Sequence, residues 1–140
     1  MPVIPINYLA VLVSAIANMV LGFLWFGPLF GKSWMALSGV SVPSPEQRKK
    51  MGPLYLLAFV AALIMAFVMA HALYFASTVL QVSGVSAGLQ AGFWNWLGFV
   101  AVVTLGMVLW EGKSWKLWAI INGYWLVSLL VMGVILGVWQ

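Results

Sequence analysis

A few polar side chains lie within otherwise apolar stretches of the chain, and they are the residues best suited to chemistry. They are the one histidine, His71, and the asparagines Asn18, Asn95 and Asn122. An imidazole exchanges protons near neutral pH, and an amide both donates and accepts hydrogen bonds. If the stretches are helices, their rise of about 1.5 Å per residue puts His71 and Asn95 at one level and Asn18 somewhat deeper. We therefore treat the four residues as a candidate polar site.

His71 is open to several interpretations. A neutral imidazole bonded to Asn95, Tyr74 or a backbone carbonyl would hold neighbouring helices in register. The side chain could instead act as a pH-responsive switch, contact a ligand in an outward-facing pocket, or bind a metal or haem. A metal is the least favoured, because one histidine per chain needs an oligomer to bring several copies together. We expect neither a metal nor another cofactor.

The other reactive side chains exclude whole classes of mechanism. The chain has no Cys and no Asp, and its two acidic residues are Glu46 and Glu111. Thiol redox chemistry, disulfides, thiolate metal sites and a Ser-His-Asp triad are therefore excluded. No pair of groups suited to acid and base catalysis lies at one depth, so the sequence predicts a protein that is not an enzyme.

Nine tryptophans among 140 residues are the second unusual feature. Most of them lie near the ends of the apolar stretches, where interfacial aromatic side chains are expected. Those closer to the middle, together with two tyrosines, form a candidate aromatic pocket for an apolar or quaternary-ammonium ligand. Its residues are Tyr74, Trp94, Trp96, Tyr124 and Trp125. The alternative is that these rings pack in the core or against lipid.

The elements that position these residues must be membrane helices. The chain is 65% hydrophobic and 6% charged, with a mean hydropathy of +1.11, whereas a soluble domain carries roughly 25% charge. Four apolar stretches, at residues 7–30, 54–80, 87–110 and 117–139, are long enough to cross a hydrocarbon core about 30 Å thick. The sequence therefore predicts one domain over residues 1–140, an all-α antiparallel bundle of four transmembrane helices.

All charged side chains fall in two of the connections between these stretches. The basic residues are Lys32, Arg48, Lys49, Lys50, Lys113 and Lys116. The positive-inside rule then predicts a multi-pass protein of the bacterial cytoplasmic (inner) membrane, with residues 31–53 as a cytoplasmic loop and both termini on the non-cytoplasmic side. The net charge of +4 is explained by contacts with lipid headgroups, so no nucleic-acid partner is expected. Within the loop, Ser44, Pro45 and Gln47 indicate a helix start with a capping box.

Rows of small residues four apart predict close helix packing. In lipid the hydrophobic effect does not drive helices together, so small side chains that let backbones approach become important. The residues assigned to such faces are Gly22, Ala58, Ala62, Ala66, Ala70, Gly88, Gly92, Gly133 and Gly137. These rows predict a compact bundle and also suggest self-association.

The string Gly-Lys-Ser-Trp occurs twice, at residues 31–34 and 112–115. One interpretation is an internal repeat that relates the first two spans to the last two. The other is that each copy simply combines residues that suit a helix end at the membrane surface.

Several separated motifs resemble a known family. They are Leu24 to Trp34 (LWFGPLFGKSW), Gly92 to Val100 (GFWNWLGFV), Trp110 to Trp115 (WEGKSW) and Ile121 to Ser128 (INGYWLVS). In this order they resemble the bacterial domain-of-unknown-function family 1761 over nearly the whole chain. The resemblance implies a small four-helix membrane protein and brings no established activity. The positions that it singles out are Trp25, Gly27, Pro28, His71, Gly98, Asn122 and Tyr124.

From these observations we expect a non-enzymatic membrane protein that acts as a homo-oligomer or as an accessory subunit of another membrane protein. One alternative is a small transporter or channel with its pathway near Asn18, His71 and Asn95, which requires a continuous polar cavity. The other alternative is a protein that binds a lipid or an apolar ligand in a Trp-lined pocket.

Overall fold

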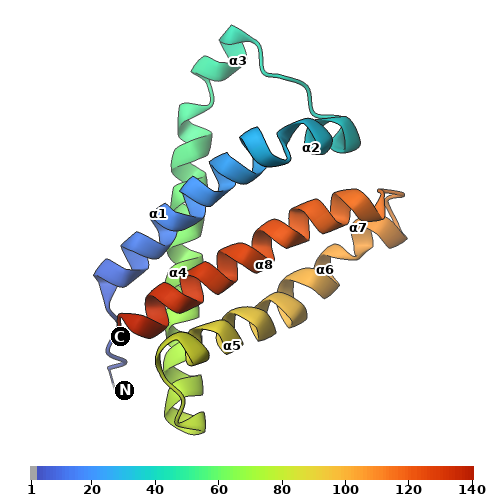
Figure 1. Ribbon diagram of the computed structural model, residues 1–140. Coiled ribbons are helices and arrows are strands. Elements are labelled where there is room, and N and C mark those ends of the chain that lie inside the picture. Colours follow the sequence, from blue (N-terminus) through green and yellow to red (C-terminus); the bar gives the residue numbers. More distant parts are fainter. Residues whose placement is uncertain (1–2) are drawn as a thin grey trace.

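The computed structural model describes residues 3–140 and contains only helices and their connections over that range (Figure 1). Four helical stretches are long and apolar enough to cross a membrane: Tyr8–Leu29, Gly52–Leu80, Gly84–Leu109 and Trp115–Val138. Each begins and ends within three residues of a span predicted from the sequence. The prediction of an all-α protein with four candidate membrane spans is confirmed.

Two of the four stretches contain π-helical turns. The first consists of α1 (Tyr8–Leu24) and the π-helix η1 (Trp25–Leu29). The third is divided into α5 (Gly84–Trp96), the π-helix η2 (Leu97–Ala101), α6 (Val102–Thr104) and α7 (Gly106–Leu109). The second and fourth are single helices, α4 (Gly52–Leu80) and α8 (Trp115–Val138), while α2 (Gly31–Ser38) and α3 (Pro45–Lys49) lie in the first connection.

The helices are arranged as a layer of three with the fourth across it. In Figure 1, α8 lies between α1 and the stretch from α5 to α7, and α4 crosses behind them at a steep angle. The 29 residues of α4 would span about 43 Å at 1.5 Å per residue, more than a hydrocarbon core of about 30 Å, so a strong tilt is expected. This arrangement refines the simple antiparallel bundle that the sequence predicted.

The most extensive helix contact, between α5 and α8, depends on glycine. A Cβ added at Gly88 would overlap the carbonyl oxygen of Gly133, and one added at Gly133 would overlap that of Gly88. A Cβ at Gly92 would lie 2.6 Å from the carbonyl oxygen of Leu129. Only the absence of a side chain permits this approach of two backbones. The glycine rows of both helices are therefore buried within one chain.

The alanine row of α4 is only partly in contact with another helix. Ala62, Ala66 and Ala70 are buried against the bundle, as expected for a packing face. Ala58 is exposed, so it does not pack against another helix of the same chain as its assignment suggested. The physical reason is the crossing angle: α1 and α4 meet along the middle of α4 and separate toward its first turns (Figure 1).

Pro28 explains the π-helical turn at the end of the first span. Proline has no backbone N–H to donate to the preceding turn, and its ring conflicts with regular α-helical geometry. The chain widens locally, and the N–H of Phe30 donates to the carbonyl of Trp25 five residues back, at 2.8 Å. Gly31 then begins α2 with its α-carbon against the carbonyl of Phe26, where a Cβ would lie only 2.7 Å from the oxygen.

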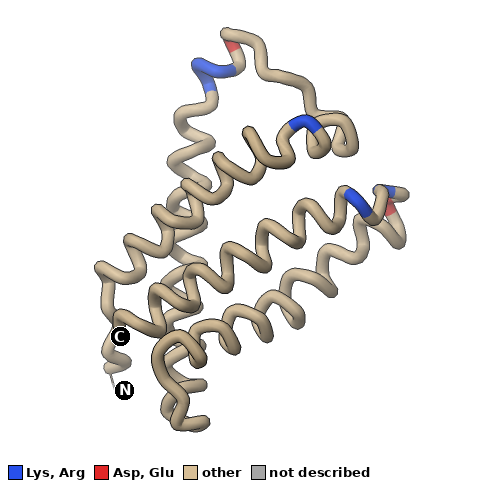
Figure 2. The backbone as a smooth tube through the Cα atoms, viewed as in Figure 1, with Lys and Arg blue, Asp and Glu red and all other residues tan. Residues whose placement is uncertain are grey.

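The charged residues lie at the helix ends that are remote from both termini (Figure 2). The six basic side chains, predicted to contact headgroups, are all exposed there.

Ser44 caps α3 in the predicted capping box, with Gln47 as its partner. The two Gly-Lys-Ser-Trp strings adopt different structures: the first lies in α2, whereas Gly112 has φ +70° in a turn and Ser114 caps α8. This difference favours the interpretation as independent helix ends.

Candidate functional site

The residues predicted to form one polar site lie in separate places. His71 Nδ1 donates to the carbonyl of Phe67 at 2.8 Å, and Asn95 Nδ2 donates to the carbonyl of Ala91 at 2.8 Å. Both bonds are made within the residue's own helix. For His71 this is the backbone-carbonyl arrangement among the interpretations above. Asn18 and Asn122 belong to two further clusters, so the structure does not join Asn18, His71 and Asn95 in one pathway.

Asn122 is the centre of a buried polar cluster that ties the third span to α8. Its Oδ1 accepts from the hydroxyl of Thr104 at 2.8 Å, and its Nδ2 donates to the carbonyl of Trp118 at 3.0 Å. The backbone carbonyl of Asn122 accepts a further bond from the indole N–H of Trp96, at 2.9 Å. Each polar atom of this asparagine side chain therefore has a partner, which suits a structural role.

Trp25 makes a matching contact from the opposite side of α8. Its indole N–H donates to the carbonyl of Ile120 at 2.9 Å. The carbonyls of Ile120 and Asn122 thus accept hydrogen bonds from two indole N–H groups, one in η1 and one at the end of α5. Trp25 is the first residue of η1 and Trp96 directly precedes η2, so the two irregular segments are anchored to the same part of α8.

A second buried cluster joins α1 to α8. The hydroxyl of Tyr124 donates to Asn18 Oδ1 at 2.9 Å, and the hydroxyl of Ser128 donates to the same oxygen. Asn18 and Tyr124 are each 6% exposed and Ser128 is fully buried. Ser128 was not among the residues predicted to form a site. Its spacing was the available signal, because a residue four positions after Tyr124 shares that residue's helix face.

The amide nitrogen of Asn18 takes no part in these two hydrogen bonds. Both hydroxyl groups bond to its oxygen, and within residues 3–140 its Nδ2 has no hydrogen-bond partner. The nitrogen is not sealed in the core, since the fully enclosed atoms without a partner in that range are Ser14 Oγ and Trp118 Nε1. An amide donor in apolar surroundings that lacks an acceptor costs roughly 1–3 kcal/mol. Asn18 therefore presents an available donor at the edge of the core.

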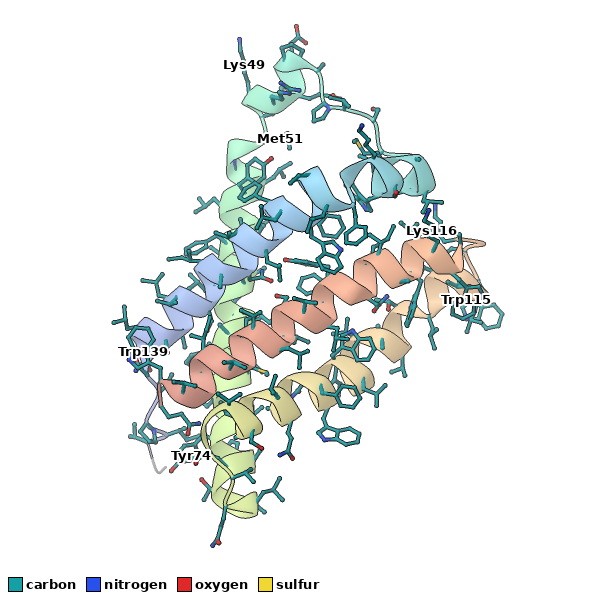
Figure 3. The ribbon with its side chains drawn as sticks, viewed as in Figure 1. Lys49, Met51, Tyr74, Trp115, Lys116 and Trp139 are labelled. Carbon is teal, nitrogen blue, oxygen red and sulfur yellow. The ribbon has the colours of Figure 1, made fainter. Side chains whose placement is uncertain are left out.

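Asn18 lines a groove between α1 and α4. The groove has a volume of about 430 Å³ and is lined by residues of both helices. The two helices separate toward α3 (Figure 1). Its lining is mostly apolar: Asn18, Met19, Gly22, Phe23, Phe26, Gly27, Trp34, Met51, Tyr55, Ala58 and Tyr124. Figure 3 shows Met51 below Lys49, at the end of the protein opposite Tyr74 and Trp139.

Aromatic rings frame this groove. The ring centroids of Phe23 in α1 and Tyr55 in α4 are 5.5 Å apart, so this pair joins the two walls. Phe26 meets Tyr124 edge to face at 5.1 Å and Trp34 at 5.2 Å. A flat or ring-bearing molecule is the natural match for such a lining, because offset and edge contacts between rings are favourable.

The predicted aromatic pocket does not form. Trp94 is 62% exposed, Trp96 is engaged with α8, and Tyr74 lies near the termini in a small cavity of about 180 Å³. Trp125 packs against Tyr124 with its ring tilted, at 4.8 Å between ring centroids, and does not line the groove. Of the five residues, Tyr124 is the one that lines the groove in the described part of the chain. The helical periodicity did not reveal this, because the groove depends on where α4 leaves α1.

A second, neighbouring groove lies between α4, α5 and η2. It has a volume of about 510 Å³ and includes Ala61, Met65, Asn95 and Phe99. Here the asparagine amide nitrogen is already bonded within its own helix. Within the described residues no group of three or more His, Cys, Asp or Glu is placed to hold a metal ion.

The family model described as "Protein of unknown function (DUF1761)" matches residues 9–137. No curated protein and no solved structure matches the chain.

Proposed function

The chain belongs to the DUF1761 family of proteins of unknown function, and we propose that it is a membrane protein that binds a small, membrane-soluble molecule in the groove between α1 and α4. The observation that carries this proposal is that Asn18, whose side-chain hydrogen bonds in residues 3–140 are made through Oδ1, lines an apolar groove with aromatic walls. Ligand sites of this kind combine an apolar wall with a few placed polar groups, and volumes of about 300–1,000 Å³ are typical.

Three features support a ligand that comes from the bilayer. The groove opens beside transmembrane helices, its lining is predominantly apolar, and the charged residues nearby lie outside it on the α2 and α3 segments. A water-soluble ligand would lose its hydration on entry without ionic partners to replace it. A membrane-soluble ligand enters without that loss.

Photolabelling tests the proposal. An aryl diazirine bearing a decyl tail is added to the protein in lipid nanodiscs, and labelled peptides are identified by mass spectrometry. We expect the label to concentrate at residues 18–27 and 51–58. Ala58→Trp fills this groove and should remove that labelling. Ala61→Trp, a matched change on the neighbouring groove of the same helix, should retain it. Uniform labelling of all lipid-facing helices, or equal labelling of both variants, would contradict the proposal.

We further propose that the protein lies in the bacterial cytoplasmic membrane with α2, α3 and the turn before α8 in the cytoplasm, and both termini outside. The position of every charged side chain at one end of the bundle supports this orientation (Figure 2). The six basic residues would then contact anionic headgroups.

A homo-oligomeric or accessory-subunit role stays a prediction. The glycine rows that suggested self-association are buried between α5 and α8 of one chain, so an oligomer would use other surfaces. The exposed side of η2, with Leu97 and Phe99, offers such a surface. A transporter pathway through Asn18, His71 and Asn95 has no support, because these side chains are bonded separately.

A further inference from the structure

We infer that the ligand of the α1–α4 groove carries a carbonyl oxygen on a flat, conjugated ring, as lipid-soluble quinones do, and that Asn18 recognises this oxygen. The inference rests on the proposed function and names the chemical class of its ligand. It is carried by the hydrogen-bonding state of Asn18 and by the position of that residue in the membrane span.

The chemistry of Asn18 specifies an acceptor. Its Oδ1 already accepts from Tyr124 and Ser128, and its backbone oxygen is 3.2 Å from the Tyr124 hydroxyl. The two N–H groups on Nδ2 are the donors of the side chain that remain for a ligand. A ligand that pairs with it must therefore supply an acceptor oxygen or nitrogen rather than a hydroxyl hydrogen.

The depth of Asn18 excludes an ordinary phospholipid as the matched ligand. Asn18 precedes Leu29, the last residue of the span, by eleven residues, which corresponds to about 16 Å along the helix and thus about half of a 30 Å core. At this depth a phospholipid presents saturated chain, because its ester oxygens lie at the membrane surface. The acceptor must belong to the apolar body of the ligand.

The lining favours an uncharged ring. The residues around the groove, all within the described part of the chain, carry no charged side chain. Phe26 and Tyr124 meet edge to face, with Tyr124 bonded to Asn18, and the rings of Phe23 and Tyr55 connect α1 to α4. A quinone satisfies these conditions together: its ring packs on the aromatic walls, its carbonyl accepts from Nδ2, and its tail follows the groove into lipid.

Two probes of the same shape test the inference. One is 2-methyl-3-decyl-1,4-naphthoquinone and the other is 2-methyl-3-decylnaphthalene, which lacks both oxygens. Each competes with the aryl diazirine for labelling of residues 18–27 in nanodiscs. We expect the quinone to displace the label at a concentration about tenfold lower than the naphthalene, the value of one hydrogen bond that satisfies a buried donor.

Asn18→Leu should abolish this tenfold difference while diazirine labelling of the groove persists. Asn95→Leu, which changes the asparagine of the other groove, should leave the difference unchanged. If Asn18→Leu does not fold, infrared spectroscopy of the wild-type protein replaces it. A hydrogen bond to Asn18 should move one carbonyl stretching band of the bound quinone to lower frequency than in empty nanodiscs.

Equal displacement by both probes, or an unshifted carbonyl band, would overturn the inference and leave the proposed function standing. If neither probe displaces the label from residues 18–27, the proposed function fails as well. A dimeric mass with crosslinks that join two copies through this groove would assign it to a second chain and overturn both.

Discussion

Gly88 of α5 and Gly133 of α8 bring the backbones of their helices into direct contact, and a Cβ on either glycine would overlap the carbonyl oxygen of the other. The contact lies in the most extensive helix interface of the protein. Because lipid surrounds the bundle, this interface is stabilised by close packing rather than by the exclusion of water. Its stability therefore depends on two residues without side chains.

The first prediction concerns this contact. Gly133→Ala should lower the free energy of unfolding by about 1–3 kcal/mol or more, because the backbone of α5 must move away. Gly98→Ala is the control, since a Cβ there meets nothing within 4 Å, and the better helix propensity of alanine should raise stability by up to about 1 kcal/mol. SDS titration of the protein in mild detergent measures both. Equal changes in unfolding free energy for the two variants would show that the backbones of α5 and α8 are not in close contact at Gly133.

The second prediction concerns the bond between Tyr124 and Asn18. Tyr124→Phe removes one of the two hydroxyls that bond to Asn18 Oδ1 and should cost about 0.5–1.5 kcal/mol of unfolding free energy. Tyr55→Phe removes a hydroxyl that has no hydrogen bond within residues 3–140, on a residue that is 43% exposed, and should change stability little. The same titration compares the two. A greater loss in Tyr55→Phe would argue against the Asn18 cluster as a link between α1 and α8.

The third prediction separates a bonded indole from an exposed one. Trp96→Phe deletes the N–H that donates to the carbonyl of Asn122 and should destabilise the protein by about 1–2 kcal/mol, including the loss of packing. Trp94, two residues away, is 62% exposed, and Trp94→Phe should have a small effect. Thermal unfolding in detergent, followed by circular dichroism, distinguishes the variants. Equal unfolding temperatures for Trp96→Phe and Trp94→Phe would indicate that Trp96 is in contact with lipid and not bonded to α8.

The fourth prediction follows from the two environments along the alanine row of α4. Ala66 is fully buried, so Ala66→Leu should overpack the core and cost about 1–3 kcal/mol. Ala58→Leu places the same volume into the groove and should preserve stability while it weakens diazirine labelling there. Thermal unfolding and labelling are measured on the same samples. A stable Ala66→Leu variant would mean that this part of α4 faces lipid.

The fifth prediction is the orientation in the membrane. A reporter active only in the periplasm, fused after Gln140, should be active because both termini are expected outside. The same reporter inserted between Val40 and Ser41, in the connection from α2 to α3, should be inactive, while a cytoplasmic reporter at that point should work. The opposite pattern would reverse the proposed topology.

Much of the fold was accessible from the sequence, because it depends on local relationships and on the solvent. The four spans follow from the length and composition of the apolar stretches, and the cap at Ser44 follows from residues three positions apart. The packing role of Gly88 and Gly133 follows from rows spaced four apart, which share a helix face by geometry alone. None of these features requires knowledge of where a second helix lies.

The candidate site could not be predicted in this way. The sequence grouped Asn18 with His71 and Asn95 by depth, whereas the structure pairs Asn18 with Tyr124 and Ser128 of a different helix. Depth along a helix is determined locally, but the direction in which a side chain points depends on the rotation of the whole helix against its neighbours. The groove likewise depends on α4 crossing α1 at an angle, which buries Ala66 and leaves Ala58 open. Crossing angles result from contacts between residues far apart in the chain, so tertiary structure alone decided which residues line the groove beside Asn18.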